Sequence, residues 1–147
     1  MINMEITDEF FSFLSGKVST AISRRLQRNL KVTGMPCCMT SEQWSIMYHL
    51  WQEEGLTQQE LAHFTYRDKP SITRLINNLE KLGLVIRVND KQDRRSNLIY
   101  LTKEGRKMKD VGLEQAKKTL YEALEGVEEE NLVIAQQILG RIFQNLK

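Results

Sequence analysis

The sequence predicts a mainly α-helical protein with a small β-hairpin, and three stretches support this prediction. Residues 68–82 have the spacing of an amphipathic helix, and the β-branched runs 84–88 and 98–101 follow it. The two runs flank the polar connection NDKQDRRSN, which suits the loop of a hairpin. A helix that leads into such a hairpin is the order of elements in a winged helix-turn-helix.

The stretch 68–82 contains the start and stop features of a short helix. Its apolar residues recur at i, i+3, i+4 and i+7 and form one stripe: Ile72, Leu75, Ile76, Leu79 and Leu82. Asp68 suits the N-cap, Pro70 is tolerated in the first turn, and Gly83 can end the helix in a left-handed conformation. We therefore expect a helix that packs one face against a core.

The opposite face of this helix is polar. It carries side chains that can hydrogen-bond to base edges or phosphates, namely Ser71, Thr73, Arg74, Asn77 and Asn78. The alternative is an ordinary surface helix whose polar face is only solvated, and the face alone does not decide between the two interpretations.

The distribution of charge favours a nucleic-acid partner. Residues 67–110 contain 12 Lys or Arg against 6 Asp or Glu, a net charge of +6. Residues 1–66 contain 5 against 7 and residues 111–147 contain 4 against 6, so each flank has a net charge of −2 and the chain has +2. Positive charge gathered on one segment indicates a polyanion such as double-stranded DNA.

The remaining helices follow from capping and periodicity. Thr40 with Gln43, and Thr57 with Glu60, fit capping boxes that open the two helices before residue 68. Wide apolar faces predict one long helix over residues 5–31 and two more over 103–125 and 128–146, and such faces often find a partner in a second chain. We divide the chain into an N-terminal dimerisation helix with its linker (1–39), a winged helix-turn-helix (40–102) and C-terminal dimerisation helices (103–147).

Composition excludes several classes of protein. The 147 residues suffice for one domain with a core, and 41% hydrophobic with 27% charged residues is ordinary for a soluble protein. A run of about 18 apolar residues is lacking, which argues against a membrane span. The N-terminus is acidic before it is apolar, unlike a secretory signal, and the adjacent Cys37 and Cys38 do not make a disulfide framework. We therefore expect a cytoplasmic protein.

Four segments together have the pattern of a known family. They are QWSIMYHLW (43–51), GLTQQELA (55–62), DKPSITRLINNLEKLGLVIR (68–87) and DRRSNLIYLTKEG (93–105). Over residues 40–105 the chain resembles the MarR family of bacterial transcription regulators. The last segment includes the family's wing signature, Asp-x-Arg followed by Leu-Thr, here Asp93, Arg95, Leu101 and Thr102.

The resemblance implies a homodimeric winged-helix regulator, more often a repressor than an activator. Helices from both chain ends would interleave, helix 68–82 would enter the major groove, and the wing would reach the adjacent minor groove. By position, Ser71, Thr73 and Arg74 would contact the major groove and phosphates. Asp93 would brace Arg95 by an ion pair and Arg94 would enter the minor groove, although the sequence leaves the division between the two arginines open.

Physical chemistry supports these roles independently. Arginine suits a narrow, negative minor groove, and a bidentate contact from Arg74 to guanine would provide about 1–3 kcal/mol of discrimination. Lys69 and Lys91 would add phosphate contacts, and Asn78 a polar contact on the helix face. The alternatives are a weak surface ion pair for Asp93 with Arg95 and simple solvation for Arg94.

The resemblance also implies a small aromatic or amphipathic effector in a cleft between the dimer helices and the winged domain. Phe11, Trp44, Tyr48 and Trp51 are the candidate lining residues. Aromatic residues at helical spacing are more often part of a core, and we favour that alternative for any single one of them.

Cysteine and histidine patterns give little support to redox or metal chemistry. Cys37 and Cys38 have no basic neighbour in sequence to stabilise a thiolate, and the family's peroxide sensors place their cysteine near the start of the first helix. His49 and His63, with these two cysteines, show no metal-ligand spacing. We expect no metal and no cofactor, and a redox role for either cysteine stays open.

The sequence thus predicts a sequence-specific DNA-binding transcription regulator that recognises an inverted repeat as a homodimer. A winged-helix protein-interaction module or a non-specific DNA-binding module is the alternative, although the polar face of helix 68–82 argues against the former. An enzyme is not expected, because the sequence shows no nucleophile–base set and no glycine-rich phosphate loop.

Overall fold

The computed structural model describes residues 4–35 and 39–147, with side chains from residue 6 onward, and it confirms the mainly α-helical fold with a small β-sheet. The N-terminal part consists of α1 (Met4–Ser12), a π-helical segment (Phe13–Lys17) and α2 (Val18–Val32). The central part contains α3 (Ser41–Gln52), β1 (Leu56–Thr57), α4 (Gln58–Thr65), α5 (Lys69–Lys81), β2 (Val85–Asn89) and β3 (Asn97–Leu101). The chain ends with α6 (Lys103–Ala123) and α7 (Glu129–Leu146).

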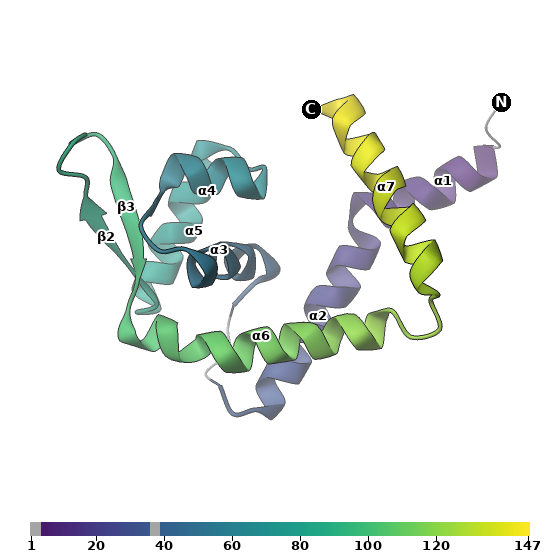
Figure 1. Cartoon of the computed structure of the whole chain (residues 1–147), viewed down its shortest axis with the longest axis horizontal. Coiled ribbons are helices and arrows are strands. Elements are labelled where there is room, and N and C mark those ends of the chain that lie inside the picture. Colours follow the sequence, from purple (N-terminus) through teal and green to yellow (C-terminus); the bar gives the residue numbers. More distant parts are fainter. Residues whose placement is uncertain (1–3, 36–38) are drawn as a thin grey trace.

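Two groups of elements are distinct in space (Figure 1). The elements from α3 to β3 form one lobe, which we call the winged head. Helices α1, α2 and α7 lie on the other side of the molecule, and α6 runs from the foot of the winged head to α2. Helix α6 is the long element shared by both groups, which also touch where Tyr66 at the end of α4 meets Phe143 of α7, with ring centroids 5.0 Å apart.

The predicted caps explain where the helices begin. Thr40 and Thr57 form complete capping boxes at α3 and α4. At α5 the Asp68 carboxylate accepts a hydrogen bond from the backbone N–H of Ser71 at 2.7 Å. Because this hydrogen bond from the Ser71 backbone stabilises the charged carboxylate, it is the main cause of a lowered pKa at Asp68. Gly83 adopts the expected left-handed conformation, with φ of 75°, after the end of the helix.

The wing is a three-stranded antiparallel sheet in the order β1-β3-β2. The predicted hairpin is present, with β2 and β3 paired from Val85 opposite Leu101 to Asn89 opposite Asn97. The sheet has in addition the short strand β1, in which Leu56 lies opposite Ile99. Sequence reasoning missed β1 because two residues are too few to show an alternating pattern.

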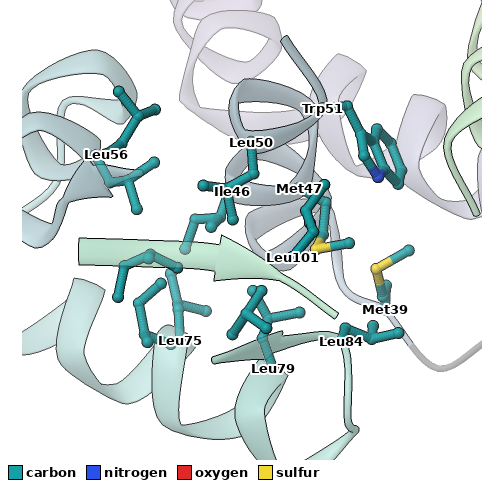
Figure 2. Packing of buried hydrophobic residues seen from close by; sticks show 14 of the residues in the cluster. Met39, Ile46, Met47, Leu50, Trp51, Leu56, Leu75, Leu79, Leu84 and Leu101 are labelled. Atoms are coloured by element: carbon teal, nitrogen blue, oxygen red, sulfur yellow. The ribbon is translucent and has the colours of Figure 1, made fainter. Parts of the chain in front are cut away.

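One apolar core holds the winged head together (Figure 2). Figure 2 shows side chains of α3, α5 and the sheet directed into a common cluster. The predicted stripe of α5 contributes the buried residues Ile72, Leu75, Ile76 and Leu79, whereas Leu82 is exposed. Leu82 is the helix C-cap, so it lies beyond the last turn that packs on the core.

Gly105 lies where the wing, α3 and α6 meet. A Cβ at this position would overlap the backbone carbonyl oxygen of Leu84. The carbonyl of Gly105 accepts a hydrogen bond from the indole Nε1–H of Trp51 at 3.0 Å, and its N–H donates to the Thr102 hydroxyl at 3.0 Å. The Thr102 hydroxyl in turn donates to the carbonyl of Gly83 at 2.6 Å. Backbone and side-chain bonds thus fix the start of α6 against the end of α5.

Glu54 joins α6 to the sheet at the base of the wing. Its carboxylate accepts two hydrogen bonds from the Arg106 guanidinium, at 2.9 and 3.1 Å, and one from the backbone N–H of Leu101 at 2.9 Å. The hydrogen bond from Arg106 is the main cause of a lowered pKa at Glu54, which burial partly opposes.

The N-terminal helix differs from the prediction of one continuous helix over residues 5–31. Gly16 has φ of 141° and ψ of −7°, which is not helical, and it lies inside the π-helical segment between α1 and α2. Periodicity continues across this kink because the apolar residues on both sides keep near-helical spacing, so the pattern did not reveal the break.

Helix α2 packs against α6 through a polar contact as well as apolar residues. The buried Asn29 amide donates to the Thr119 hydroxyl at 2.9 Å and to the Glu122 carboxylate at 3.2 Å. Arg25 also pairs with Glu122. Burial of an amide requires such partners, so this contact fixes the register of the two helices.

Helices α1 and α7 expose much of their apolar surface in the single chain. The exposed large apolar side chains of α7 are Val133, Ile134, Ile138, Leu139, Phe143 and Leu146. Those of α1 include Ile6, Phe10 and Phe11. In the described part of the chain every helix is too short or too polar to span a bilayer.

Substitution of Gly105 by alanine should destabilise the fold by about 1–3 kcal/mol, because the new methyl group would displace the Leu84 backbone. Chemical denaturation monitored by circular dichroism measures this change. Gly140→Ala in α7 is the control, since an added Cβ there meets no atom of the same chain within 4 Å and alanine favours a helix. Equal stability of the two variants would contradict the close approach.

Glu54→Gln should lower the free energy of unfolding by about 1 kcal/mol at neutral pH, because the variant cannot form the charged bonds to Arg106. A lowered folded-state pKa stabilises the fold above the unfolded pKa, and this stabilisation disappears as pH falls through the folded pKa. The difference between wild type and variant should therefore shrink from about pH 6 to about pH 3. Urea titrations at both pH values test this, and a constant difference would refute the assignment.

Candidate nucleic-acid interface

The outer face of α5 presents polar side chains beside the wing. Lys69, Arg74 and Asn78 are exposed and Ser71 is half-buried. The side chain of Arg74 is 68% exposed, which leaves most of its guanidinium available to a partner. Ser71, Arg74 and Asn78 extend along the face away from the core stripe, as the periodicity predicts, and Lys69 lies at the first position of the helix.

Two predicted polar residues of α5 are partly used inside the protein. The Thr73 hydroxyl donates to the carbonyl of Lys69 at 3.0 Å and accepts from the Gln58 amide of α4 at 3.1 Å. Asn77 accepts a hydrogen bond from the Arg87 guanidinium, which also pairs with Glu80 at 3.1 Å. Thr73 therefore connects the two helices of the helix-turn-helix, and Asn77 connects α5 to β2.

The wing loop is closed by its own backbone and by Asp93. The N–H of Asp90 donates to the carbonyl of Ser96 at 3.1 Å, and the N–H of Ser96 donates to the carbonyl of Asp93 at 3.0 Å. The Asp93 carboxylate accepts from the backbone N–H of Arg95 at 3.0 Å and from the Ser96 hydroxyl at 3.4 Å. This is the local turn that aspartate commonly forms with the backbone two residues on.

The expected ion pair between Asp93 and the Arg95 side chain is a wrong prediction. Within residues 6–35 and 39–147 no ion pair joins these side chains, and the Asp93 carboxylate instead accepts hydrogen bonds from the Arg95 backbone and the Ser96 hydroxyl. Asp93 shapes the loop through the backbone, and both Arg94 and Arg95 are exposed at its tip with Lys91. In the described structure none of these three cations has an acidic partner.

Sequence reasoning missed two charged residues at this surface. Arg67 immediately precedes the N-cap of α5, and Glu42 lies in the first turn of α3. The Glu42 carboxylate is 3.6 Å from Arg67 and 4.0 Å from Arg74. The position of Arg67 just before a capping residue could have marked it as a candidate, but no sequence pattern indicated that Glu42 lies close to α5.

A cavity of about 500 Å³ lies between α2, α3 and α6. Trp44 and Tyr48 line it, together with residues that include Leu26, Ser19 and Leu120. Trp51 is buried, with its ring 5.1 Å from that of Trp44, and its indole N–H is bonded to Gly105, so it belongs to the core. Phe11 is 71% exposed on α1, and the cavity's described lining does not include it. A second cavity of about 450 Å³, with Lys17 and Arg25 at its wall, adjoins the first.

Histidine and acidic residues do not gather into a metal-binding group within the described ranges. His49 stacks on Phe64 with ring centroids 5.4 Å apart, which accounts for its position between α3 and α4. Cys37 and Cys38 lie outside the described residues.

Comparison with known proteins agrees with this architecture. A sequence profile of the MarR family matches residues 39–96. The chain is 32% identical over 106 residues to the HTH-type transcriptional regulator FarR of Neisseria gonorrhoeae, an alignment that covers 71% of each protein. It is 27% identical over 128 residues to the organic hydroperoxide resistance transcriptional regulator of Bacillus subtilis, with 76% of this chain and 87% of that one covered.

The solved structures have the same fold. A MarR-family transcriptional regulator from Rhodococcus sp. RHA1 superposes with a TM-score of 0.72 at 25% sequence identity, over 92% of this chain and 93% of the other. The relatives are transcriptional regulators, and the family profile covers the winged head from α3 through the exposed cationic loop, up to the start of β3. The chain therefore belongs to the MarR family and is a DNA-binding transcription regulator.

Proposed function

We propose that this regulator is a homodimeric, ligand-responsive repressor that binds an inverted-repeat operator. The observation that carries the proposal is the combination of a polar, exposed face on α5 with a cationic wing tip. In this proposal α5 enters the major groove and the wing contacts the adjacent minor groove. The division of the chain into dimerisation helices and a winged head remains part of the same proposal.

The side chains of α5 and the wing would have separate roles in recognition. Arg74 and Asn78 are the residues we propose for base edges, with Ser71 and Thr73 at phosphates or bases. Lys69, on α5, would contact the phosphate backbone.

On the wing, Arg94 would enter the minor groove, where the planar guanidinium suits a narrow, strongly negative groove. Lys91 and Arg95 would lie at the neighbouring phosphates, with Asp93 keeping the loop in shape.

The exposed apolar faces of α1 and α7 support a homodimer. Contiguous apolar surface of this kind is rare on a monomer and marks an interaction site. A second copy would cover it symmetrically, and the two-fold axis would place two α5 helices about one helical turn, roughly 10 bp, apart on DNA. The operator would then be an inverted repeat.

The cavity beside Trp44 and Tyr48 supports an effector site. Its walls come from α2 and α6 on one side and from α3 of the winged head on the other. A small aromatic or amphipathic molecule bound there would change how the head is held against α6. Apolar pockets with a few hydroxyl groups commonly bind such molecules. A redox response through Cys37 or Cys38 is the second candidate for regulation.

Two other functions have less support. A protein-interaction module would need an apolar outer face on α5, but that face carries Arg74 and Asn78. A non-specific DNA-binding module would have the same cations without base discrimination, and the experiment below separates it from a sequence-specific regulator.

Selection of binding sites from a random duplex DNA pool tests the proposal. Purified protein at physiological salt should enrich a palindromic sequence with half-sites about 10 bp apart. An enriched palindrome also supplies the probe needed to search for effectors. Retention of DNA without any enriched sequence would contradict operator recognition and favour non-specific binding.

Arg94→Ala should weaken binding to the enriched duplex and reduce the dependence of affinity on salt, by about 0.9 in the log–log slope for each phosphate that the variant no longer neutralises. Fluorescence anisotropy across a salt series measures both quantities. Arg28→Ala removes the same charge from an exposed position on α2, a helix on the other side of the molecule from the wing (Figure 1), and should have no comparable effect. If the two variants behave alike, the wing has no specific role.

Leu139→Asp should convert the protein to a monomer at micromolar concentration, because a carboxylate would replace an apolar side chain in the middle of the exposed α7 face. Sedimentation velocity reports the change. Gln144→Asp, on the opposite face of the same helix, should remain dimeric. A wild-type monomer that still binds DNA tightly would refute the homodimer.

A further inference from the structure

Two arginines at the proposed DNA surface already have an anionic partner within the protein. Glu42, from the first turn of α3, lies 3.6 Å from the guanidinium of Arg67 and 4.0 Å from that of Arg74. All three side chains are accessible, with exposed fractions of 40% for Glu42, 34% for Arg67 and 68% for Arg74. A carboxylate therefore lies where phosphates of bound DNA would have to approach.

The ion pairs with Arg67 and Arg74 are the main interactions of the Glu42 side chain. Asp68, the second carboxylate near these arginines, caps α5 through Ser71, so its presence is explained by the helix. Within the described residues the ion pairs to Arg67 and Arg74 are the side-chain interactions of Glu42. In the first turn of α3 its negative charge also interacts favourably with the helix dipole, a modest stabilisation that any first-turn glutamate would provide.

Carboxylate and phosphate compete for the same guanidinium protons. Both anions bind arginine in a bidentate manner, and an exposed carboxylate pair is weak enough for DNA to displace. The electrostatic part of DNA binding does not depend on sequence, so this competition reduces affinity for DNA of any sequence.

We propose that Glu42 is an intramolecular competitor of DNA phosphate for Arg67 and Arg74, and that it limits the affinity of the regulator for DNA. The inference rests on the proposed function, because it takes α5 as the DNA-contacting helix. It adds a role for an acidic residue on the DNA-facing side of α3 and assigns Arg67 to the binding surface. Salt weakens the internal ion pairs as well as the contacts with DNA, so Glu42 also makes binding less sensitive to salt.

The test compares two glutamates in matched positions. Glu42→Gln should tighten binding to a fluorescein-labelled duplex of scrambled sequence roughly two- to tenfold, the range that one or two exposed ion pairs provide, and should steepen the salt dependence. Glu104→Gln is the control: Glu104 lies in the first turn of α6, pairs with Lys107 at 3.6 Å and changes the net charge equally. Helix α6 begins just after the end of β3 that is away from the wing loop, and Glu104 lies at this start of the helix.

The competition requires Arg67 and Arg74, so a second experiment removes both arginines. In an Arg67→Gln/Arg74→Gln background, Glu42→Gln should leave affinity unchanged. Equal gains from the two single glutamate variants, weaker binding by Glu42→Gln, or a gain that persists without the arginines would each overturn the inference. Thermal unfolding of Glu42→Gln and Glu104→Gln should shift alike, since both lose the same helix-dipole contribution.

The outcomes separate this inference from the proposed function. A specific gain from Glu42→Gln in a protein that selects no palindrome would sustain the inference and overturn operator recognition. Selection of a palindrome with no specific gain from Glu42→Gln would do the reverse. If no variant binds the scrambled duplex and no sequence is selected from the random pool, the inference and the proposed function both fail.

Discussion

The close approach of Gly105 to the carbonyl oxygen of Leu84 is the constraint on which the arrangement of the winged head depends. It allows α6 to begin directly beneath the turn between α5 and β2, where Thr102 and Trp51 bond to the same short segment. A side chain at this position would push α6 away from the sheet. The orientation of the wing, and hence of its cations relative to α5, therefore follows from one position that lacks a Cβ.

The same helix carries this constraint to the other end of the molecule. About four turns beyond Gly105, the Thr119 hydroxyl accepts a hydrogen bond from the buried side-chain amide of Asn29 in α2. Helix α6 is therefore attached to the wing at one end and to the N-terminal helices near the other. The cavity beside Trp44 lies between these two attachments. In the proposed homodimer, a ligand bound there would lie against the helix that links the winged head to the N-terminal helices. This would be a physical route from the proposed effector site to the spacing of the two heads.

The sequence predicted the features that depend on local patterns. Helix α5 was predicted with its N-cap and with the four residues of its stripe that are buried. The hairpin was predicted from two β-branched runs, because each feature is determined by neighbours in the chain. The kink at Gly16 and strand β1 leave no periodic signature, and the bond from Trp51 to Gly105 joins residues 54 positions apart. For the candidate site, the sequence identified the exposed arginines but not their partners. Asp93 forms a turn with the backbone in place of the expected ion pair. Glu42 lies near Arg74 because the fold packs α3 against α5, which no local pattern shows.

Those partners change how the positive charge of the central segment should be counted. Arg87 is bonded to Glu80 and Asn77, and Arg106 is bonded to Glu54, so both belong to the scaffold of the wing. Arg67 and Arg74 share Glu42, whereas in the described structure the cations of the wing tip have no acidic partner. The net charge of residues 67–110 therefore overstates what DNA can use at once. In the proposed complex, the unpaired cations of the wing tip would attract DNA at long range. Arg67 and Arg74 would contribute only when the surfaces are close enough for phosphate or base edges to replace the Glu42 carboxylate.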